Sequence, residues 1–307
     1  MELLRDDLSA FEGKTVLTIG NFDGIHRGHQ ALIEHIMERA EALGVKSGVV
    51  TFDPHPATVL KPTGAPPLLT TLEEKIALLE GLGLDLLVLL TFNRELMQTR
   101  AATFLERLNE GLQPRELWVG QDFAMGYKRE GDVAFIQRWA EPRAIDVHPI
   151  SLIEVDGEVI SSSRIRALLA EGDVEDAARL LGRPPSVTGI VRQGDRRGRA
   201  IGFPTANIIP PTNHALPANG VYATRTALPT GETIPSVTNV GTRPTFGGQQ
   251  RQVESYLFDW SGDLYDQPIT VHFLYHLREE KKFEGIEALL AQIRTDAAEA
   301  RRLLAET

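Results

Sequence analysis

The chain has 307 residues, enough for two domains with substantial cores, and its formal net charge of −10 argues against a protein that binds nucleic acid. It contains no cysteine, which excludes disulfide bonds and thiolate–zinc sites. The N-terminus is interrupted by charges and the longest apolar runs are too short to span a bilayer, so we expect a soluble, cytoplasmic protein with no membrane partner.

Strand-like and helix-like segments alternate over the first 183 residues. Apolar runs predict strands at 15–20, 48–52, 84–90, 117–120 and 144–149. Helical periodicity separates them at 29–43, 72–80 and 101–109. In the first helix, the residues expected to share the buried face are Leu32, Ile33, Ile36, Ala40 and Leu43, and Gly44 is expected to end it. This alternation predicts a doubly wound parallel sheet, in which ligands lie beyond the carboxyl ends of the strands.

A glycine-rich segment, Gly20–His29, joins the first predicted strand to the first predicted helix. Free backbone N–H groups and the positive end of the helix dipole in such a turn suit a polyphosphate. His26 and His29 are one helical turn apart, so their imidazoles project to the same side and can add hydrogen-bond donors.

Two other interpretations of this segment are possible. The first is an ordinary strand–helix turn with two surface histidines. The second is a metal site made by His26 and His29 with Asp23, Asp53 and His55, all residue types that bind metals. The flanking glycines have no use in a zinc site, whereas they have an obvious use around phosphates.

Two further segments favour the phosphate interpretation. Thr51–Pro56 directly follows the second predicted strand and therefore lies at the same edge of the sheet. Ser161–Arg166 opens another predicted helix, with hydroxyls at its N-terminus and Arg164 and Arg166 in its first turn. Arginine gains nothing from the helix dipole at that end, so a bound anion would explain both residues.

The pattern changes at Gly182–Ser186, where two prolines follow a short helical segment at 173–181. We therefore predict two domains, residues 1–183 and 184–307. The second domain has short runs typical of an all-β barrel or sandwich at 187–192, 220–226, 236–240, 253–259 and 269–275. A closing amphipathic helix, 284–304, is expected to pack on it through Ile286, Leu289, Leu290, Ile293 and Ala297.

The second domain lacks the Gly-x4-Gly-Lys-Ser/Thr segment, which excludes Walker-type phosphate binding. It has instead a glycine- and arginine-rich stretch, Gly194–Asn207, that ends in Pro-Thr-Ala-Asn. From composition alone this stretch is a basic, solvated hairpin loop.

In combination, these motifs resemble the prokaryotic bifunctional riboflavin kinase/FAD synthetase family. The segments similar to its N-terminal half are Gly20–His29, Asp53–Pro56, Val119–Phe123 and Ile160–Arg166. The segments similar to its flavokinase half are Gly194–Asn207, Pro217–Tyr222, Ser236–Phe246, Glu254–Trp260 and Leu277–Phe283. The resemblance implies that the second domain is a six-stranded barrel. It also implies phosphorylation of riboflavin by ATP and transfer of AMP from ATP to FMN, giving FAD and pyrophosphate.

Adenylylation of FMN needs no protein base, because the second pKa of a phosphate monoester is about 6 and the nucleophile arrives ionised. The site must align two polyanions and stabilise charge on the leaving pyrophosphate. We assign that role to His26, His29 and Arg166. The other predicted contacts to ATP are Gly20, Asn21, Phe22, Gly24, Gly28, Ser162, Ser163 and Arg164, and those to the flavin are Asp53, Pro56, Asp122 and Phe123.

Riboflavin phosphorylation involves an alcohol nucleophile, so it gains from a carboxylate base and a metal-bridged ATP. Glu254 occupies the position of the family's catalytic base, and Thr205 and Asn207 occupy the positions that bind Mg²⁺. Both offer hard, neutral oxygens, and residues two apart on a strand face the same side. The predicted phosphate contacts of this domain are Gly194, Arg197, Gly198 and Gly202, and the flavin contacts are Asn239 and Arg243.

Two alternative functions are weighed against this one. The chain could be a nucleotidyltransferase for another phosphorylated small molecule, with the second half as a substrate domain. It could also be a non-catalytic flavin-binding protein. A base and a magnesium pair, Glu254 with Thr205 and Asn207, argue against both. The sequence makes no prediction about the oligomeric state.

Overall fold

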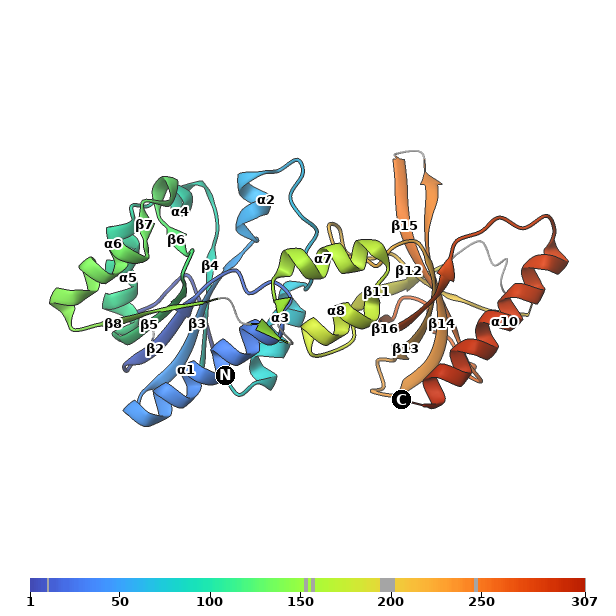
Figure 1. Ribbon diagram of the computed structural model, residues 1–307, viewed down its shortest axis with the longest axis horizontal. Coiled ribbons are helices and arrows are strands. Elements are labelled where there is room, and N and C mark those ends of the chain that lie inside the picture. Colours follow the sequence, from blue (N-terminus) through green and yellow to red (C-terminus); the bar gives the residue numbers. More distant parts are fainter. Residues whose placement is uncertain (10, 152–153, 156–157, 194–201, 246–247, 307) are drawn as a thin grey trace. The chain divides into compact units, whose positions relative to one another are not determined.

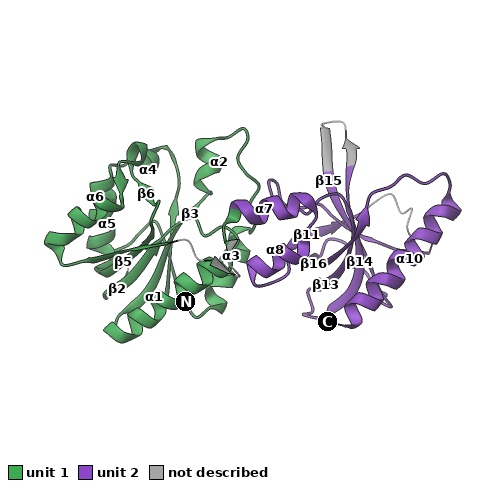
Figure 2. Cartoon of the chain, viewed as in Figure 1, with its two compact units in different colours: residues 1–162 green, residues 163–307 purple. Residues whose placement is uncertain are grey.

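The protein is described from a computed structural model that covers residues 1–9, 11–151, 154–155, 158–193, 202–245 and 248–306. The chain folds into two compact units, residues 1–162 and 163–307 (Figure 2). The boundary predicted at 183/184 concerns functional domains and stays a prediction. No helix in the described part of the chain is long and apolar enough to cross a membrane.

The first unit contains a six-stranded, wholly parallel sheet with the strand order β1-β4-β3-β2-β5-β8 (Figure 1). Its strands are β1 Glu2–Arg5, β2 Thr15–Ile19, β3 Lys46–Asp53, β4 Leu86–Thr91, β5 Pro114–Gly120 and β8 Asp146–Ile150. Five of them confirm the predicted strands, and β1 was not predicted. The chain order reverses between the neighbours β2 and β5, which makes the carboxyl ends of these two strands the place for a ligand.

Helices cover both faces of this sheet (Figure 1). The longer ones are α1 Arg27–Leu43, α3 Leu72–Gly81, α5 Ala101–Leu112 and α6 Val133–Ala140. The strands alternate between the two cores: Val16 packs with α1 and α3, whereas its neighbour Leu17 packs with α5 and α6. Burial of both faces explains why these strands are almost continuously apolar.

The predicted end of the first helix is confirmed, because Gly44 adopts φ 63° and its N–H bonds to the carbonyls of Ala40 and Glu41. The predicted buried face is wrong at Leu43, which is 43% exposed. Leu43 is the last residue of α1, so it lies beyond the turns that the core covers.

Short elements fill the connections of the first unit. They are α2 Pro56–Leu60, α4 Arg94–Gln98, η1 Tyr127–Arg129, η2 Glu141–Arg143 and the strands β6 Ala124–Met125, β7 Gly131–Asp132, β9 Glu154–Val155 and β10 Glu158–Val159. Of these, α2 follows β3 directly, after a cis peptide bond between Asp53 and Pro54.

The second unit is a closed antiparallel barrel with the strand order β11-β12-β15-β14-β13-β16, which confirms the predicted barrel. Its strands are β11 Ser186–Arg192, β12 Ala206–Ile208, β13 Gly220–Ala227, β14 Thr233–Thr245, β15 Gly248–Leu257 and β16 Pro268–Glu279. Two helices precede the barrel, α7 Ser162–Glu171 and α8 Val174–Leu181. Helix α8 packs on β16, and the carbonyl of Leu169 on α7 accepts a hydrogen bond of 2.7 Å from the N–H of Ala218.

One layer of the barrel interior is polar rather than apolar. The fully buried hydroxyls that form it hydrogen-bond to one another at 2.7 to 3.0 Å, and they belong to Thr224, Thr226, Ser236, Thr238 and Ser255. Each buried hydroxyl is therefore satisfied. Because Ser255 faces the interior, its neighbours Glu254 and Tyr256 face the outside of the barrel.

The closing helix, α10 Ile286–Ala305, packs on the outside of β13, β14 and β16, as predicted. Its buried apolar residues are Ala297, Ala300 and Leu304, which meet Val221, Ala223, Val237 and Phe258. Ile286 is 60% exposed, so its predicted burial is wrong. The fully buried contacts begin only at Asp296, and the first turn of α10 lies beyond them.

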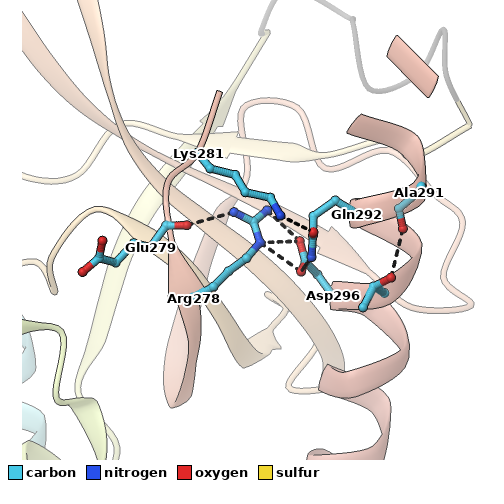
Figure 3. Close-up of polar contacts among 7 residues, drawn as sticks. Arg278, Glu279, Lys281, Ala291, Gln292 and Asp296 are labelled. Carbon is cyan, nitrogen blue, oxygen red and sulfur yellow. Dashed lines mark hydrogen bonds and ion pairs between the residues drawn. The ribbon is translucent and has the colours of Figure 1, made fainter. Parts of the chain in front are cut away.

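A nearly buried ion pair holds α10 to the barrel (Figure 3). The Arg278 guanidinium donates to both carboxylate oxygens of Asp296, with Nη2 at 2.7 Å and Nε at 3.0 and 3.1 Å. Gln292 adds a hydrogen bond of 2.7 Å to the same carboxylate and accepts one from the ammonium of Lys281. The side chains of Arg278 and Asp296 are only 20% and 7% exposed.

Removal of the Asp296 carboxylate should therefore destabilise the protein. We expect Asp296→Ala to lower the free energy of unfolding by about 3 kcal/mol, because it leaves the Arg278 charge in a desolvated place without its partner. The matched control is Asp259→Ala, whose carboxylate is 79% exposed and pairs with Arg301 on the same helix; it should change the free energy by about 1 kcal/mol or less. Urea titrations followed by circular dichroism test this, and equal midpoints for the two variants would contradict it.

Candidate functional site

The loop between β2 and α1 lies at the carboxyl end of β2, where the strand order reverses. Its backbone is tightly wound. Phe22 and Ile25 have φ values of 47° and 38°, unusual for residues with side chains, and Gly24 has φ 87°. A side chain at Gly20 would meet the ring of Phe22, since its Cβ would lie 3.0 Å from Cε2. Such strain is typical of a site that holds a ligand.

His26 and His29 lie face to face at the start of α1, as their spacing predicts. Their rings stack with centroids 3.6 Å apart, and the buried ring of Phe22 lies 5.0 Å from that of His29. His26 is the N-cap of α1, and its Nδ1 accepts a hydrogen bond of 3.3 Å from the backbone N–H of His29. An Nδ1 that accepts carries no proton, so the ring proton of His26 is on Nε2.

Burial lowers the pKa of His29 well below its ordinary value, and the nearby His26 and Lys75 lower it further. The imidazole of His29 is therefore neutral near pH 7 in the ligand-free protein. Its Nδ1 is buried, with no hydrogen-bond partner among the residues that the structure describes. Negative charge placed beside the ring would raise this pKa and favour the protonated form.

The segment around Leu69–Lys75 holds the loop between β2 and α1 through several hydrogen bonds. The buried carboxylate of Asp23 accepts hydrogen bonds from the N–H groups of Leu69 and Thr70, at 2.9 and 3.3 Å. The hydroxyl of Thr70 accepts a bond of 3.2 Å from the N–H of Gly24, and the ammonium of Lys75 donates to the carbonyl of Asn21 at 2.7 Å. This support was not predicted from the sequence. A signal was available, because Lys75 lies four residues before the apolar Leu79 and therefore on the same face of the predicted helix.

Not all the backbone N–H groups expected to face a phosphate are free to do so. The N–H of Gly20 donates to the carbonyl of Val50 at 3.1 Å, and the N–H of Gly24 donates to Thr70. Gly28 is the second residue of α1, whose first turn carries no acidic residue. The phosphate contacts of Gly20, Gly24 and Gly28 stay predictions.

The metal interpretation of this region is wrong in its geometry. In the described ranges, the only group with three ligand atoms within 4.8 Å of one another is Glu116, Asp146 and His148, which includes none of the five residues considered. Both oxygens of Glu116 already accept hydrogen bonds from Arg39. Asp23 is occupied by backbone N–H groups, and His26 and His55 use Nδ1 to cap helices.

The predicted flavin contacts of the first unit lie at the same sheet edge. Asp53 ends β3, and Pro56 is the first residue of α2. Asp122 and Phe123 follow the end of β5, and β3 and β5 flank β2 in the sheet. Asp122 is exposed, whereas Phe123 packs partly against the core. The expectation that Thr51–Pro56 lies at the same sheet edge as the loop after β2 is confirmed by the topology, which puts Asp122 and Phe123 at that edge too. The contacts of these residues with a flavin stay predictions.

Helix α7 begins at Ser162, whose hydroxyl donates a hydrogen bond of 2.9 Å to the carbonyl of Asp23. Ser163 and Arg164 are exposed in its first turn, which has no acidic residue. Arg166 lies in the second turn and not in the first. Ser163 and both arginines belong to the second unit, whereas the two histidines belong to the first.

In the second unit, strand pairing brings the predicted base and one predicted metal ligand together. Glu254 on β15 is directly opposite Asn207 on β12 and, on its other side, directly opposite Asn239 on β14. Residues opposite one another in an antiparallel pair share a face and have Cβ atoms about 5 Å apart. The three half-buried side chains therefore form one row on the outside of the barrel, which we call the Glu254 row.

Thr205 lies beside this row. The side-chain amide of Asn207 donates to the hydroxyl of Thr205 at 3.3 Å and to its carbonyl at 3.2 Å, so the predicted metal ligands are side by side. Aromatic rings border the row. Tyr256 packs edge-on against Phe203 and Phe258, with centroids 5.2 and 5.7 Å away.

Several predicted residues of this unit can be placed only in part. Gly194, Arg197 and Gly198 lie outside the described residues. Gly202 is exposed with φ 86°, a conformation that favours glycine. Arg243 is opposite Gln250 in the register of β14 and β15.

Comparison with known protein families finds two matches. Residues 8–164 match the model described as FAD synthetase, and residues 181–304 match the model described as riboflavin kinase. The chain is 42% identical over 292 residues to a bifunctional riboflavin kinase/FMN adenylyltransferase of Pseudomonas fluorescens, covering 94% of this chain and 93% of that protein. Proteins with the same description from Escherichia coli (strain K12) and Bacillus subtilis (strain 168) are each 38% identical, again with 95% of this chain and 93% of the relative covered.

A solved structure is similar over nearly the whole chain. It is a crystal structure from Streptococcus pneumoniae described as a macrolide-efflux protein, with a TM-score of 0.88 and 26% sequence identity. The match covers 97% of this chain and 98% of that one.

Proposed function

The chain belongs to the family of bacterial bifunctional riboflavin kinase/FMN adenylyltransferases, and on this premise we propose how its residues perform the two reactions. The substrates are riboflavin, FMN and ATP. One reaction phosphorylates riboflavin to FMN, and the other transfers AMP from ATP to FMN, releasing pyrophosphate. The range similar to FAD synthetases lies almost wholly in the first unit, and the range similar to riboflavin kinases lies in the second.

Adenylylation is assigned to the loop between β2 and α1. The phosphate of FMN is ionised at neutral pH, so the site has to orient it and stabilise the charge that develops on pyrophosphate. His26 can donate through Nε2–H, whose position its N-cap bond sets. His29 becomes a better donor once phosphates raise its pKa. The stacked pair at a helix N-terminus supports this role.

The remaining contacts of this reaction are proposals as well. Ser162, Ser163, Arg164 and Arg166 are assigned to the phosphates of ATP because α7 has no acidic residue in its first turn. Asn21 and Phe22 are part of the loop between β2 and α1 and are assigned to ATP as well. The edge formed by the ends of β3 and β5 is assigned to the flavin.

Riboflavin phosphorylation is assigned to the Glu254 row, and the pairing of Asn207 with Glu254 is the observation that carries this assignment. A carboxylate on the outer face of the barrel can accept the proton of the ribityl hydroxyl as the oxygen attacks the terminal phosphate of ATP. Asn239 is assigned to the flavin end of the substrate, and its place opposite Glu254 supports this proposal.

Mg²⁺ is a proposed cofactor of the kinase reaction. The amide nitrogen of Asn207 lies 3.3 Å from the hydroxyl of Thr205, so the two side chains are adjacent. The amide oxygen of Asn207 and the hydroxyl of Thr205 are the neutral oxygen donors that Mg²⁺ accepts. When bound, Mg²⁺ would neutralise charge on the phosphates of ATP. Thr205 and Asn207 would hold it next to the carboxylate of Glu254.

This assignment predicts a selective metal defect. We expect Asn207→Ala to raise the Mg²⁺ concentration needed for half-maximal riboflavin phosphorylation by about tenfold, since one ligand is lost. FMN adenylylation should keep its wild-type Mg²⁺ dependence, and EDTA should stop phosphorylation in the wild type. Magnesium titrations of the two activities test this. An unchanged requirement in Asn207→Ala would remove this residue from the metal site.

The alternatives fit less well. A nucleotidyltransferase for another small molecule leaves the match of residues 181–304 to riboflavin kinases unexplained. A non-catalytic flavin-binding protein has no need for a carboxylate paired with a metal ligand. We retain 1–183 and 184–307 as the functional domains, and we propose a cytoplasmic location.

A time course tests the proposed function directly. Pure protein is incubated with riboflavin, ATP and MgCl2, and the flavins are separated at intervals. FMN should rise first and then decline as FAD accumulates. A protein that phosphorylates riboflavin but never converts supplied FMN to FAD would contradict the adenylylation assignment, and the reverse result would contradict the kinase assignment.

A further inference from the structure

A buried lysine lies beneath the loop that connects β2 to α1. Lys75 on α3 is 6% exposed, and it is the only buried lysine or arginine among the residues whose burial the structure describes. Burying an ammonium is costly unless it is paired or hydrogen-bonded. The position of Lys75 therefore calls for an explanation that packing does not supply.

The ammonium of Lys75 holds one point of the wound loop. Its Nζ donates a hydrogen bond of 2.7 Å to the carbonyl of Asn21, which also accepts a bond of 3.2 Å from the hydroxyl of Thr51. The next residue, Phe22, has the positive φ of 47°. Two buried residues thus donate to the peptide that enters the strained turn and fix its orientation.

The charge of Lys75 lacks a close counter-ion. In the described part of the chain it forms no ion pair within 4.0 Å, and two of its three N–H donors have no partner. The carboxylates of Asp23 and Asp53 are near enough to favour its charged form, but burial outweighs them and lowers the pKa of Lys75 below its usual value. Asp23 already accepts two backbone hydrogen bonds.

The field of this charge reaches the histidine pair. Lys75 contributes to the lowered pKa of His29, so the ammonium and the imidazole are close enough to repel one another when both are charged. The Lys75 ammonium thus lies near the histidine pair, with no carboxylate within ion-pair distance among the described residues. An anion bound at the histidines would be attracted by this charge and would stabilise it.

We propose that Lys75 is a positioning residue for adenylyl transfer, which orients the loop through the Asn21 carbonyl and supplies a fixed positive charge for the phosphates of ATP. This inference rests on the adenylylation function proposed above. It assigns to α3 a part in phosphate binding that the glycine and histidine motif alone does not contain.

The test compares three variants of the full chain. Lys75→Met keeps the length of the side chain and removes both the charge and the hydrogen bond, whereas Lys75→Arg keeps the charge. The matched control is Lys46→Met, since Lys46 is 59% exposed and pairs with Asp85 in the same unit. The readouts are the KM values for ATP and FMN in adenylylation, inhibition of that reaction by inorganic pyrophosphate, and riboflavin phosphorylation.

With Lys75→Met, we expect the KM for ATP and the inhibition constant of pyrophosphate to rise about tenfold, equivalent to about 1.4 kcal/mol. The KM for FMN and riboflavin phosphorylation should change less than about twofold, and Lys46→Met should match the wild type. Lys75→Arg should restore most of the pyrophosphate inhibition. A purely structural lysine would not separate ATP and pyrophosphate from FMN in this way.

Three results would overturn the inference. One is wild-type KM for ATP and wild-type pyrophosphate inhibition in Lys75→Met. Another is an equal loss toward ATP and FMN, which means general damage to the loop. The third result applies only if Lys75→Met does not fold. In that case, loss of pyrophosphate inhibition in a folded Lys75→Arg variant would contradict the inference. Failure of the wild type to make FAD is a different result and would contradict the proposed function itself.

Discussion

Glu254→Gln is expected to abolish riboflavin phosphorylation while leaving the conversion of supplied FMN to FAD intact. Glutamine has nearly the same shape as glutamate but cannot accept the proton of the ribityl hydroxyl. Loss of a positioned general base typically lowers a rate by about 10² to 10⁴-fold. The substitution keeps the side chain opposite Asn207 and Asn239, so the barrel should fold normally.

The two activities of one chain provide an internal control for this variant. Each reaction is measured on the same preparation, with riboflavin or FMN as the flavin substrate. Glu232→Gln is the matched control, because Glu232 is exposed in the same unit and should behave as wild type in both assays. Equal loss of both activities in Glu254→Gln would indicate misfolding and discredit the role of Glu254 as the base.

His29→Ala is expected to lower the rate of FMN adenylylation by about 10²-fold or more, as the loss of a preorganised donor usually does. The imidazole of His29 is held by stacking on His26 and by the ring of Phe22, so its orientation is set before ATP binds. Alanine removes the donor and the stacking partner together. Riboflavin phosphorylation should be unchanged, because it depends on the other unit.

His35→Ala controls for damage to the helix. His35 is an exposed residue of α1 that contacts Trp118 edge-on, with centroids 4.4 Å apart, and it is far along the helix from the loop. Steady-state kinetics with FMN and ATP should give wild-type rates for His35→Ala. Near-normal FAD formation by His29→Ala would remove this histidine from the mechanism.

Much of the candidate site could be predicted from the sequence because its parts are local. His26 and His29 stack because a helix puts residues three apart on one side. Their place at the carboxyl edge of a parallel sheet follows from an apolar strand before the loop and a helix after it. No local pattern places Glu254 beside Asn207, since they are 47 positions apart in the chain. Only the register of β12 on β15 makes them neighbours.

The sequence missed what depends on distant contacts. The position of Lys75 one helical turn before Leu79 is the only local sign of its burial, and the hydrogen bond that holds its ammonium comes from a loop 54 residues away. In the same way, Asp23 resembled a metal ligand, but the N–H groups of Leu69 and Thr70 occupy its carboxylate. The exposure of Leu43 and Ile286 depends on where each core ends, which periodicity does not reveal.

The sequence by itself determined most of the long helices and strands, that they form a parallel sheet followed by a barrel, and which residue types could handle phosphate. These follow from periodicity, glycine and proline, and side-chain chemistry, all of which act over a few residues. Only the tertiary structure decided which polar groups remain available for a ligand. A hydrogen bond from a segment about 50 residues away can occupy one carboxylate and leave a neighbouring ammonium unpaired, and no local pattern records that choice.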